Sequence, residues 1–222
     1  MLTPTAVVFD LDGTLIDTEH LWDEVRRELA AQDGLPWPDE ATVAMMGLST
    51  QEWSAYLVDV VGLRGPADQA ARRTIGALRA RFADGVPVLP GAVAAVRRMA
   101  ARGPIGVASS SPRVLIDAAL DTMGVRDLMG AVRSTEEGEG RGKPAPDAFL
   151  WACRTLGVAP HRAVAVEDSA NGLLAAHAAG MKVVAIPPHF QPPPPDVLAL
   201  ADVILDDIDG LTDALVTRLL AG

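Results

Sequence analysis

Short apolar runs separated by helical patterns constrain the fold of this 222-residue chain more than any other feature. The runs predict β-strands near 5–10, 104–109, 163–167 and 182–186, with weaker candidates at 129–133 and 202–205. Amphipathic patterns predict helices at 91–102, 112–123, 146–156, 170–179 and 210–220. A chain in which strands and helices alternate forms a parallel sheet with helices on both faces. We therefore expect an α/β, Rossmann-like core.

The segment 17–86 interrupts this alternation, because it contains no convincing strand. Leu21, Val25 and Leu29 share one face of a predicted helix, and a further helical pattern lies near the end of the segment. The segment therefore reads as an inserted α-helical domain. The predicted division of the chain is a core domain of residues 1–16 and 87–222 and a helical domain of residues 17–86.

Two carboxylates follow the first predicted strand directly. Asp10 and Asp12 stand at its end, and Gly13 and Thr14 come next. The crevice beyond the carboxyl ends of parallel strands is where α/β sheets bind ligands, so this position favours a functional site. A solvated turn is the alternative, since Asp-Gly is a common turn dipeptide.

A cluster of serines ends the second strong strand. Ser109, Ser110 and Ser111 precede Pro112, which suits the first position of a helix that Ser111 would cap. The free N–H groups at the start of such a helix, beside hydroxyls, form an anion site. Ordinary helix capping explains the same residues without a ligand.

Two further segments carry charged groups. Pro144 keeps Lys143 extended, so that Lys143 can act as a positioned positive charge, although a solvated loop lysine is the alternative. Glu167 and Asp168 end the strand near 163–167, where helix capping is the alternative. If all these strand ends meet, four carboxylates surround one lysine.

Such a cluster needs more positive charge than one lysine supplies. Two like charges about 4 Å apart repel by roughly 4 kcal/mol at an effective dielectric constant of 20. Oxygen ligands favour a hard divalent cation, and Mg²⁺ fits best because it uses few carboxylates and keeps several waters. A metal, an ammonium group and hydroxyl donors together describe a site for phosphoryl chemistry.

The chain resembles the haloacid dehalogenase (HAD) superfamily, whose four motifs appear in order. They are Asp10-Leu11-Asp12-Gly13-Thr14, Ser109, Lys143 and Glu167-Asp168. The helical insert is similar to the cap domain of the first subclass of this superfamily. True dehalogenases of the superfamily lack the second aspartate, so Asp12 speaks against dehalogenation.

The resemblance implies a phosphatase that works through an aspartyl phosphate. Asp10 would attack phosphorus, and Asp12 would protonate the leaving oxygen and later deprotonate water. Ser109 and Lys143 would complete the catalytic set. The expected phosphate-binding residues are Gly13, Thr14, Ser109, Ser110 and Lys143. The expected Mg²⁺ ligands are Asp10, the main-chain carbonyl of Asp12, Glu167 and Asp168.

The branch that the chain resembles holds sugar-phosphate phosphatases and β-phosphoglucomutase. Mutases of this branch have a histidine and an arginine where this chain has Trp22 and Thr50. Because arginine can clamp a second phosphate with two hydrogen bonds, its absence favours hydrolysis, and a phosphomutase is the alternative. The expected cap contacts to a sugar or polyol phosphate are His20, Trp22, Thr50 and Gln51. Trp53, Met45 and Met46 can line the same face or pack inside the helical domain.

Composition narrows the choice of partners. A formal net charge of −10 argues against nucleic acid or an anionic membrane as partner. The single cysteine, Cys153, excludes an internal disulfide and lies in a predicted helix, where we expect it in the core. We see neither a signal peptide nor an apolar stretch of membrane length, and expect a cytoplasmic enzyme, monomeric or weakly dimeric. A receiver-like regulatory domain has a chemically similar pocket, but the helical insertion argues against it.

Overall fold

The computed structural model describes residues 5–45, 48–138, 140–189 and 192–221. The chain divides into two compact units, the first formed by Met1–Asp17 with Pro87–Gly222 and the second by Thr18–Val86. The roles of these units as core and cap stay a prediction. No helix in the described residues is long and apolar enough to cross a membrane.

The first unit is built on a parallel sheet. Its strands are β1 (Ala6–Phe9), β2 (Ile105–Ser109), β3 (Met129–Ser134), β4 (Ala163–Glu167), β5 (Lys182–Ala185) and β6 (Val203–Ile204). They follow the order β3-β2-β1-β4-β5-β6, and every neighbouring pair is parallel. The α/β, Rossmann-like fold expected from the sequence is therefore confirmed, including both weaker strands. The strand order reverses between β1 and β4, and such a switch point is where open α/β sheets bind ligands.

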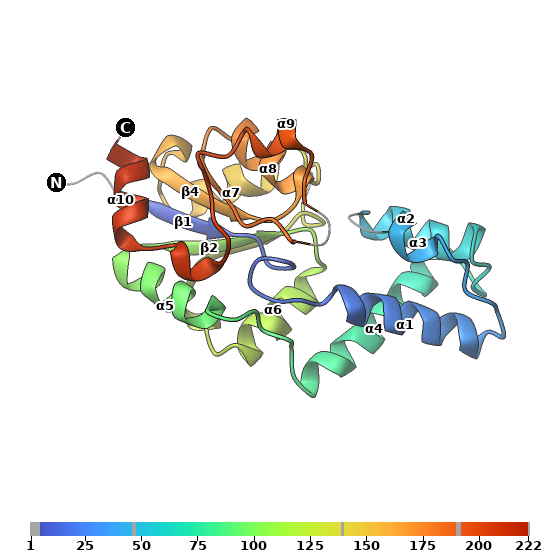
Figure 1. Cartoon of the computed structure of the whole chain (residues 1–222). Helices are drawn as coiled ribbons and strands as arrows, with labels where there is room; N and C mark the ends of the chain where they lie inside the picture. Colours follow the sequence, from blue (N-terminus) through green and yellow to red (C-terminus); the bar gives the residue numbers. More distant parts are fainter. Residues whose placement is uncertain (1–4, 46–47, 139, 190–191, 222) are drawn as a thin grey trace. The chain divides into compact units, whose positions relative to one another are not determined.

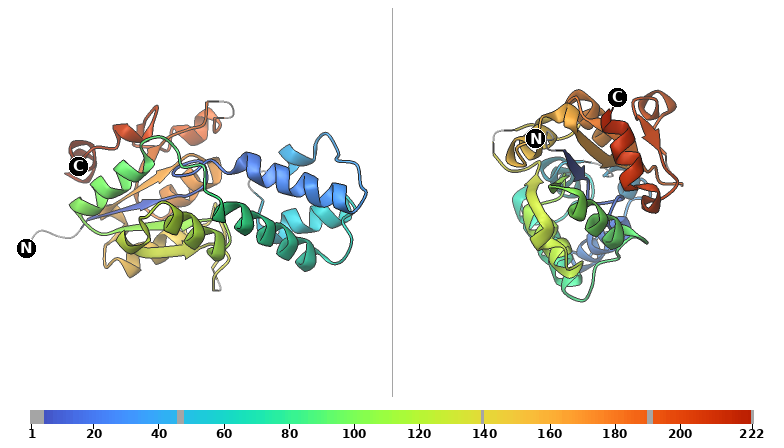
Figure 2. Two further views of the ribbon diagram at one scale, coloured as in Figure 1. Left: turned by 90° about the horizontal axis from the view of Figure 1, so that it is seen from below. Right: turned by 90° about the vertical axis from the view of Figure 1, so that its left-hand side faces the viewer.

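Helices cover both faces of this sheet (Figures 1 and 2). The long helices of the unit are α5 (Ala92–Arg102), α6 (Arg113–Thr122), α7 (Asp147–Thr155), α8 (Ala170–Ala178) and α10 (Asp213–Ala221). Ala6 and Val8 of β1 pack in one cluster with residues of α7 and α8, because alternate strand residues point to the same face. Cys153 of α7 is 1% exposed in that cluster, as expected for a core residue.

Short helical segments complete the first unit. They are η1 (Arg126–Leu128), η2 (Pro160–Arg162), η3 (Ile208–Gly210) and α9 (Pro195–Leu198). One detail of the sequence prediction is wrong: α6 begins at Arg113, and its N-cap is Pro112 rather than Ser111. The physical reason is that the Ser111 hydroxyl donates a hydrogen bond to Asp12 Oδ2 at 2.5 Å, so it is not available to cap the helix.

The second unit is helical, as the sequence predicts. Its helices are α1 (Glu19–Gln32), α2 (Ala41–Ala44), α3 (Thr50–Asp59) and α4 (Ala67–Ala83), labelled in Figure 1. Val25 and Leu29 lie on the buried face of α1, whereas Leu21 is only partly buried. Ser49 starts α3 with a capping box in which its side chain and that of Glu52 each bind the other's main-chain N–H.

The two segments that join the units pair with each other inside the first unit. Ile16 and Val88 form an antiparallel bridge. Asp17 N donates to Pro87 O at 2.8 Å, and Leu89 N donates to Leu15 O at 3.0 Å. The chain therefore leaves the first unit and returns to it at adjacent positions.

Candidate active site

Strand register places Asp10 beside Glu167. Phe9 pairs with Val166 across the switch point, and Asp10 N donates to Val166 O at 2.9 Å. The next residue of each strand therefore lies at the same level, at the carboxyl ends of β1 and β4. Asp10 is 6% exposed and Glu167 is fully buried.

The loop after β1 turns tightly against Asp168. Gly13 N donates to Ile16 O at 2.7 Å, and Gly13 has a φ of 89°, in the left-handed region that glycine adopts at little cost. A Cβ at this position would lie 2.0 Å from Asp168 Oδ2. Glycine is thus required here for two reasons, and its lack of a side chain lets the loop carrying Asp12 approach the end of β4.

Lys143 joins the two buried carboxylates. Its Nζ donates to Asp10 Oδ1 and, at 2.5 Å, to Glu167 Oε1. The Lys143 side chain is only 4% exposed and lies over the ring of Phe149, with its nitrogen 5.2 Å from the ring centroid. The lysine is therefore a positioned charge inside the site, and the solvated-loop alternative is excluded.

One ammonium group does not neutralise this cluster. Burial raises the pKa of Asp10 to about 8 against the opposing charge of Lys143, and Glu167 adds to the rise. Burial and the charges of Asp10 and Glu167 also raise the pKa of Asp168 well above its usual value. For Lys143, burial favours the neutral amine, but the two carboxylates outweigh it and raise the pKa of the ammonium group. Lys143 therefore stays charged, whereas the raised pKa values of Asp10 and Asp168 oppose the ionisation of both acids at once.

The donor set fits a hard divalent cation. Asp10, Glu167 and Asp168 each offer a carboxylate oxygen, and these oxygens lie within 4.8 Å of one another. Asp168 Oδ1 is buried without a hydrogen-bond partner, so it is available as a ligand. A bound cation would favour the ionised carboxylates and so offset the raised pKa values of Asp10 and Asp168. These residues therefore fit Mg²⁺, whose preferred ligands are oxygens.

Ser111 is a site residue that the sequence analysis did not select. Besides its bond to Asp12, its main-chain N–H donates to Ser109 Oγ at 3.0 Å, and its carbonyl accepts a hydrogen bond from Ser134 Oγ at 2.7 Å. The serine is therefore held from both sides while its hydroxyl fixes the Asp12 carboxylate. The only sequence signal for it was the run of three serines after β2.

The other expected phosphate-binding residues lie in the same unit. Ser109 is 1% exposed at the end of β2. Thr14 is 2% exposed, and its Oγ1 is buried without a partner. Ser110 is exposed. The structure thus brings Asp10, Asp168 and Lys143 together, whereas the phosphate-binding roles remain predictions.

The four expected cap contacts belong to the second unit. His20 and Gln51 are exposed, whereas Trp22 is partly buried and packs edge-on against Trp53 with ring centroids 5.7 Å apart. Thr50 Oγ1 is buried without a partner. Trp53 and Met45 are 3% and 1% exposed and so pack inside the helical unit, while Met46 lies outside the described residues.

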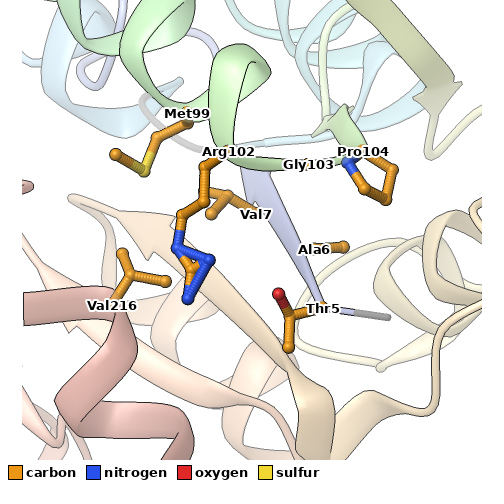
Figure 3. Close-up of a pocket in the computed structure, with 8 residues that line it drawn as sticks. All are labelled: Thr5, Ala6, Val7, Met99, Arg102, Gly103, Pro104 and Val216. Carbon is orange, nitrogen blue, oxygen red and sulfur yellow. The ribbon is translucent and has the colours of Figure 1, made fainter. Parts of the chain in front are cut away.

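The pocket drawn in Figure 3 is not part of this site. Thr5, Ala6 and Val7 line it at the start of β1, together with Arg102 at the end of α5. It therefore lies at the amino end of the sheet, opposite the carboxyl ends that carry Asp10 and Glu167.

A glycine in α8 gives a testable consequence of the close packing around Glu167. A Cβ at Gly172 would lie 1.9 Å from Glu167 Cδ and 2.0 Å from each carboxylate oxygen. We expect Gly172→Ala to lower the free energy of unfolding by about 1–3 kcal/mol, the usual cost of overpacking, and to impair catalysis by displacing Glu167. Urea unfolding and phosphate release measure the two effects.

Gly76→Ala is the matched control, because Gly76 also lies within a helix but has nothing within 4 Å of the added Cβ. Alanine is the better helix former, so this change should raise the free energy of unfolding by up to about 1 kcal/mol. Equal effects of the two substitutions would contradict the packing described for Glu167.

Comparison with known proteins identifies the family of the chain. A sequence profile of haloacid dehalogenase-like hydrolases matches residues 4–180. The chain is 33% identical over 208 residues to validoxylamine A 7'-phosphate phosphatase of Streptomyces hygroscopicus subsp. limoneus, covering 90% of this chain and 92% of the relative. It is 33% identical over 221 residues to hexitol phosphatase B of Escherichia coli (strain K12), covering 93% and 94%.

A solved structure shows the same fold. The crystal structure of CbbY from Rhodobacter sphaeroides in complex with phosphate has a TM-score of 0.81 and 28% sequence identity, covering 94% of this chain and 96% of that chain. The profile match spans the strands that carry Asp10, Ser109 and Glu167, as well as the segment that delivers Lys143. The chain therefore belongs to the haloacid dehalogenase-like hydrolases.

Proposed function

We propose that this hydrolase is a Mg²⁺-dependent phosphatase that releases phosphate from a small sugar or polyol phosphate. The observation that carries the proposal is the position of Asp10 at the end of β1, bound by Lys143 and flanked by Glu167 and Asp168. A nucleophilic carboxylate, a fixed ammonium group and a metal-ligating pair are together suited to phosphoryl transfer.

In the first half of the proposed reaction, the Asp10 carboxylate attacks phosphorus. The bond between phosphorus and the substrate oxygen breaks, and an aspartyl phosphate forms on Asp10. Asp12 supplies the proton that the departing alkoxide needs, as a general acid. The Ser111 hydroxyl holds the Asp12 carboxylate at 2.5 Å and so limits the directions in which Asp12 can deliver the proton.

In the second half, water replaces the alcohol. Asp12, now ionised, takes a proton from the water, whose oxygen attacks phosphorus. The bond between phosphorus and Asp10 breaks, which restores the Asp10 carboxylate and yields inorganic phosphate. One residue can serve both halves because it is left unprotonated by the first and reprotonated by the second.

The remaining site residues bind the phosphoryl group and the cation. Ser109 and Lys143 would contact phosphoryl oxygens, with Gly13, Thr14 and Ser110 as further candidates. Asp10, Asp168 and the main-chain carbonyl of Asp12 would hold Mg²⁺, with Glu167 binding directly or through water. When bound, the cation would supply positive charge that offsets the phosphoryl oxygens and keeps Asp10 ionised.

The second unit is proposed as a cap that recognises the rest of the substrate, with the core formed by residues 1–16 and 87–222 and the cap by residues 17–86. His20, Trp22, Thr50 and Gln51 are the proposed contacts. The names of two relatives, a validoxylamine A 7'-phosphate phosphatase and a hexitol phosphatase, support a polyhydroxylated substrate. The net charge of −10 supports a small metabolite rather than nucleic acid. A cytoplasmic location and a monomeric or weakly dimeric state stay predictions.

A panel of sugar and polyol monophosphates, incubated with Mg²⁺ and read by released phosphate, tests the function. We expect turnover of hexose or hexitol phosphates, and its absence on every monoester would favour a receiver-like binding module.

The mutase alternative is tested with β-glucose 1-phosphate and the bisphosphate primer, followed by ³¹P NMR. Because Trp22 and Thr50 stand where a mutase has histidine and arginine, we expect no glucose 6-phosphate. Isomerisation faster than phosphate release would make the protein a mutase.

Removal of metal ions by chelation tests whether phosphate release depends on Mg²⁺. EDTA should eliminate phosphate release, Mg²⁺ should restore it, and Ca²⁺ should restore little because its coordination is larger and looser. Asp168→Ala should raise the Mg²⁺ concentration needed for half-maximal activity more than Glu167→Gln does. The reason is that Asp168 Oδ1 has no other partner, whereas Glu167 also binds Lys143 and Ser169. Full activity in EDTA would refute the proposed site.

A further inference from the structure

An arginine is buried between two tryptophans in the helical unit. Arg26 of α1 is 6% exposed. Its guanidinium carbon lies 4.9 Å from the ring centroid of Trp22 and 5.2 Å from that of Trp53. Trp22 lies one turn before Arg26 on α1, and Trp53 lies on α3, so the three side chains connect these two helices. Figure 1 labels both helices.

The guanidinium group of Arg26 is not fully satisfied. Its Nε is buried without a hydrogen-bond partner. Asp23 is one of the two acids that raise the pKa of Arg26, and it already accepts hydrogen bonds from Arg27 Nε and from Thr42. Burial lowers the pKa of Arg26 to about 10, although Glu19 and Asp23 act in the opposite direction. The arginine is therefore a buried cation with an unused donor.

A second unsatisfied polar atom lies on α3. Thr50 Oγ1 is buried without a partner. Thr50 lies three residues before Trp53, so both side chains lie on one side of α3. Buried polar atoms in proteins almost always have hydrogen-bond partners. An unpartnered donor against Trp53 and an unpartnered hydroxyl one helical turn before Trp53 therefore point to a ligand.

Packing alone explains this arrangement poorly. An arginine that only filled space would cost the desolvation of a charge, which an apolar side chain such as methionine would avoid. The two aromatic rings offset part of that cost by cation–π attraction. They do not supply Nε with a conventional hydrogen-bond acceptor.

The charges nearby decide between a charged and an uncharged ligand group. Glu19 and Asp23, the acids whose charges act on Arg26, would repel an anionic ligand group. Uncharged hydroxyl groups can accept a hydrogen bond from Arg26 and can donate to Thr50 or accept from it. The tryptophan edges and faces suit the C–H groups of a polyol chain.

We propose that Arg26, Thr50, Trp22 and Trp53 form a binding site for the uncharged, hydroxyl-bearing end of the substrate. This inference rests on the proposed function. It makes Arg26 the residue that contributes most to the preference of the enzyme for a hydroxyl-bearing substrate. Arg26 is not among the four contacts expected from the sequence, and it stands at a different position from the arginine that mutases use for a second phosphate.

The test compares a hexitol phosphate with n-hexyl phosphate, which has the same chain length but no hydroxyl groups. Arg26→Met should lower kcat/KM for the hexitol phosphate about 10- to 100-fold, the usual effect of losing a hydrogen bond from a charged donor. The value for hexyl phosphate should change less than about threefold. Arg72→Met is the control, because Arg72 belongs to the same helical unit, on α4, but is exposed and pairs with Asp68. It should change neither substrate selectively.

Thr50→Val supplies a second variant in case Arg26→Met does not fold, because it is nearly isosteric and removes only the hydroxyl. It should lower kcat/KM selectively for the hexitol phosphate, about threefold to tenfold. Circular dichroism and melting temperature check the fold of each variant. Equal losses on both substrates, or no loss in either folded variant, would overturn the inference.

Binding separates this inference from the proposed function. Titration of wild type and Arg26→Met with the hexitol phosphate, followed by tryptophan fluorescence, requires no turnover. If the wild type binds but releases no phosphate, and the variant binds at least tenfold more weakly, the proposed function fails and the inference stands. If the wild type prefers a hexose bisphosphate to the monophosphate by more than tenfold, and the preference disappears in Arg26→Met, the site recognises an anion and the inference is wrong.

Discussion

Replacement of Asp10 by asparagine is expected to abolish phosphate release. An amide cannot attack phosphorus as a carboxylate does, and loss of an enzyme nucleophile lowers kcat by factors on the order of 10⁴–10⁶. The fold should persist because the two side chains have nearly the same shape. Removing one of several crowded buried acids also relieves repulsion with Glu167 and Asp168. Released phosphate and the melting temperature measure both parts of this prediction.

A trapped adduct tests the same role directly. A crystal of the wild type grown with Mg²⁺ and a fluoride mimic of the phosphoryl group should show the mimic against an Asp10 oxygen. An adduct on another side chain, or wild-type rates in Asp10→Asn, would refute nucleophilic attack by this residue.

Loss of the proton donor is expected to have the second largest effect. General acid–base groups contribute roughly 10²–10⁴-fold, so Asp12→Asn should slow hydrolysis of an alkyl phosphate by about that factor. The loss should be smaller in the first half-reaction of p-nitrophenyl phosphate, whose leaving group needs no proton. Rapid-quench detection of a phosphoenzyme would then show it accumulating, since the second half-reaction still needs the base. Unchanged activity on an alkyl phosphate would contradict the role of Asp12.

Two substitutions of Ser111 test whether its hydrogen bond supports the role of Asp12. Its hydroxyl holds the Asp12 carboxylate, so Ser111→Ala should slow the alkyl phosphate about tenfold, the effect of one hydrogen bond to a charged group. Ser111→Thr keeps the hydroxyl and should recover most of the rate. A threonine variant as slow as the alanine variant would mean that Ser111 acts by packing rather than by its bond to Asp12.

Much of the sheet could be predicted because local sequence determines it. β1, β2 and β4 are short apolar runs, and a polar residue marks where each run ends, as Asp10 does for β1. Parallel pairing then brings these ends to one edge of the sheet, so Asp10 and Glu167 could be expected together without knowledge of the register. The cluster of carboxylates proposed to hold Mg²⁺ could also be expected, because several acidic residues end strands at that edge.

The parts that could not be predicted depend on contacts between distant segments. Ser111 reads as a helix cap in the sequence, and only the approach of the β1 and β2 loops shows that its hydroxyl binds Asp12. Nothing in the sequence distinguishes Arg26 from the other charged residues of α1, since arginine is seldom buried. Its burial becomes visible only when α3 brings Trp53 against it.

The paired segments around Ile16 and Val88 have a consequence for how such an enzyme can change over time. Asp17 and Pro87 are hydrogen-bonded to each other, so the sheet needs only a short turn between them to close. Lengthening a loop whose ends are already fixed costs little free energy, because closure entropy grows slowly with length. Helices between these two points can therefore be exchanged, shortened or rebuilt while the strands keep their order. Under the proposed function, substrate choice can therefore change in the helical unit while the residues proposed for phosphoryl transfer stay unchanged.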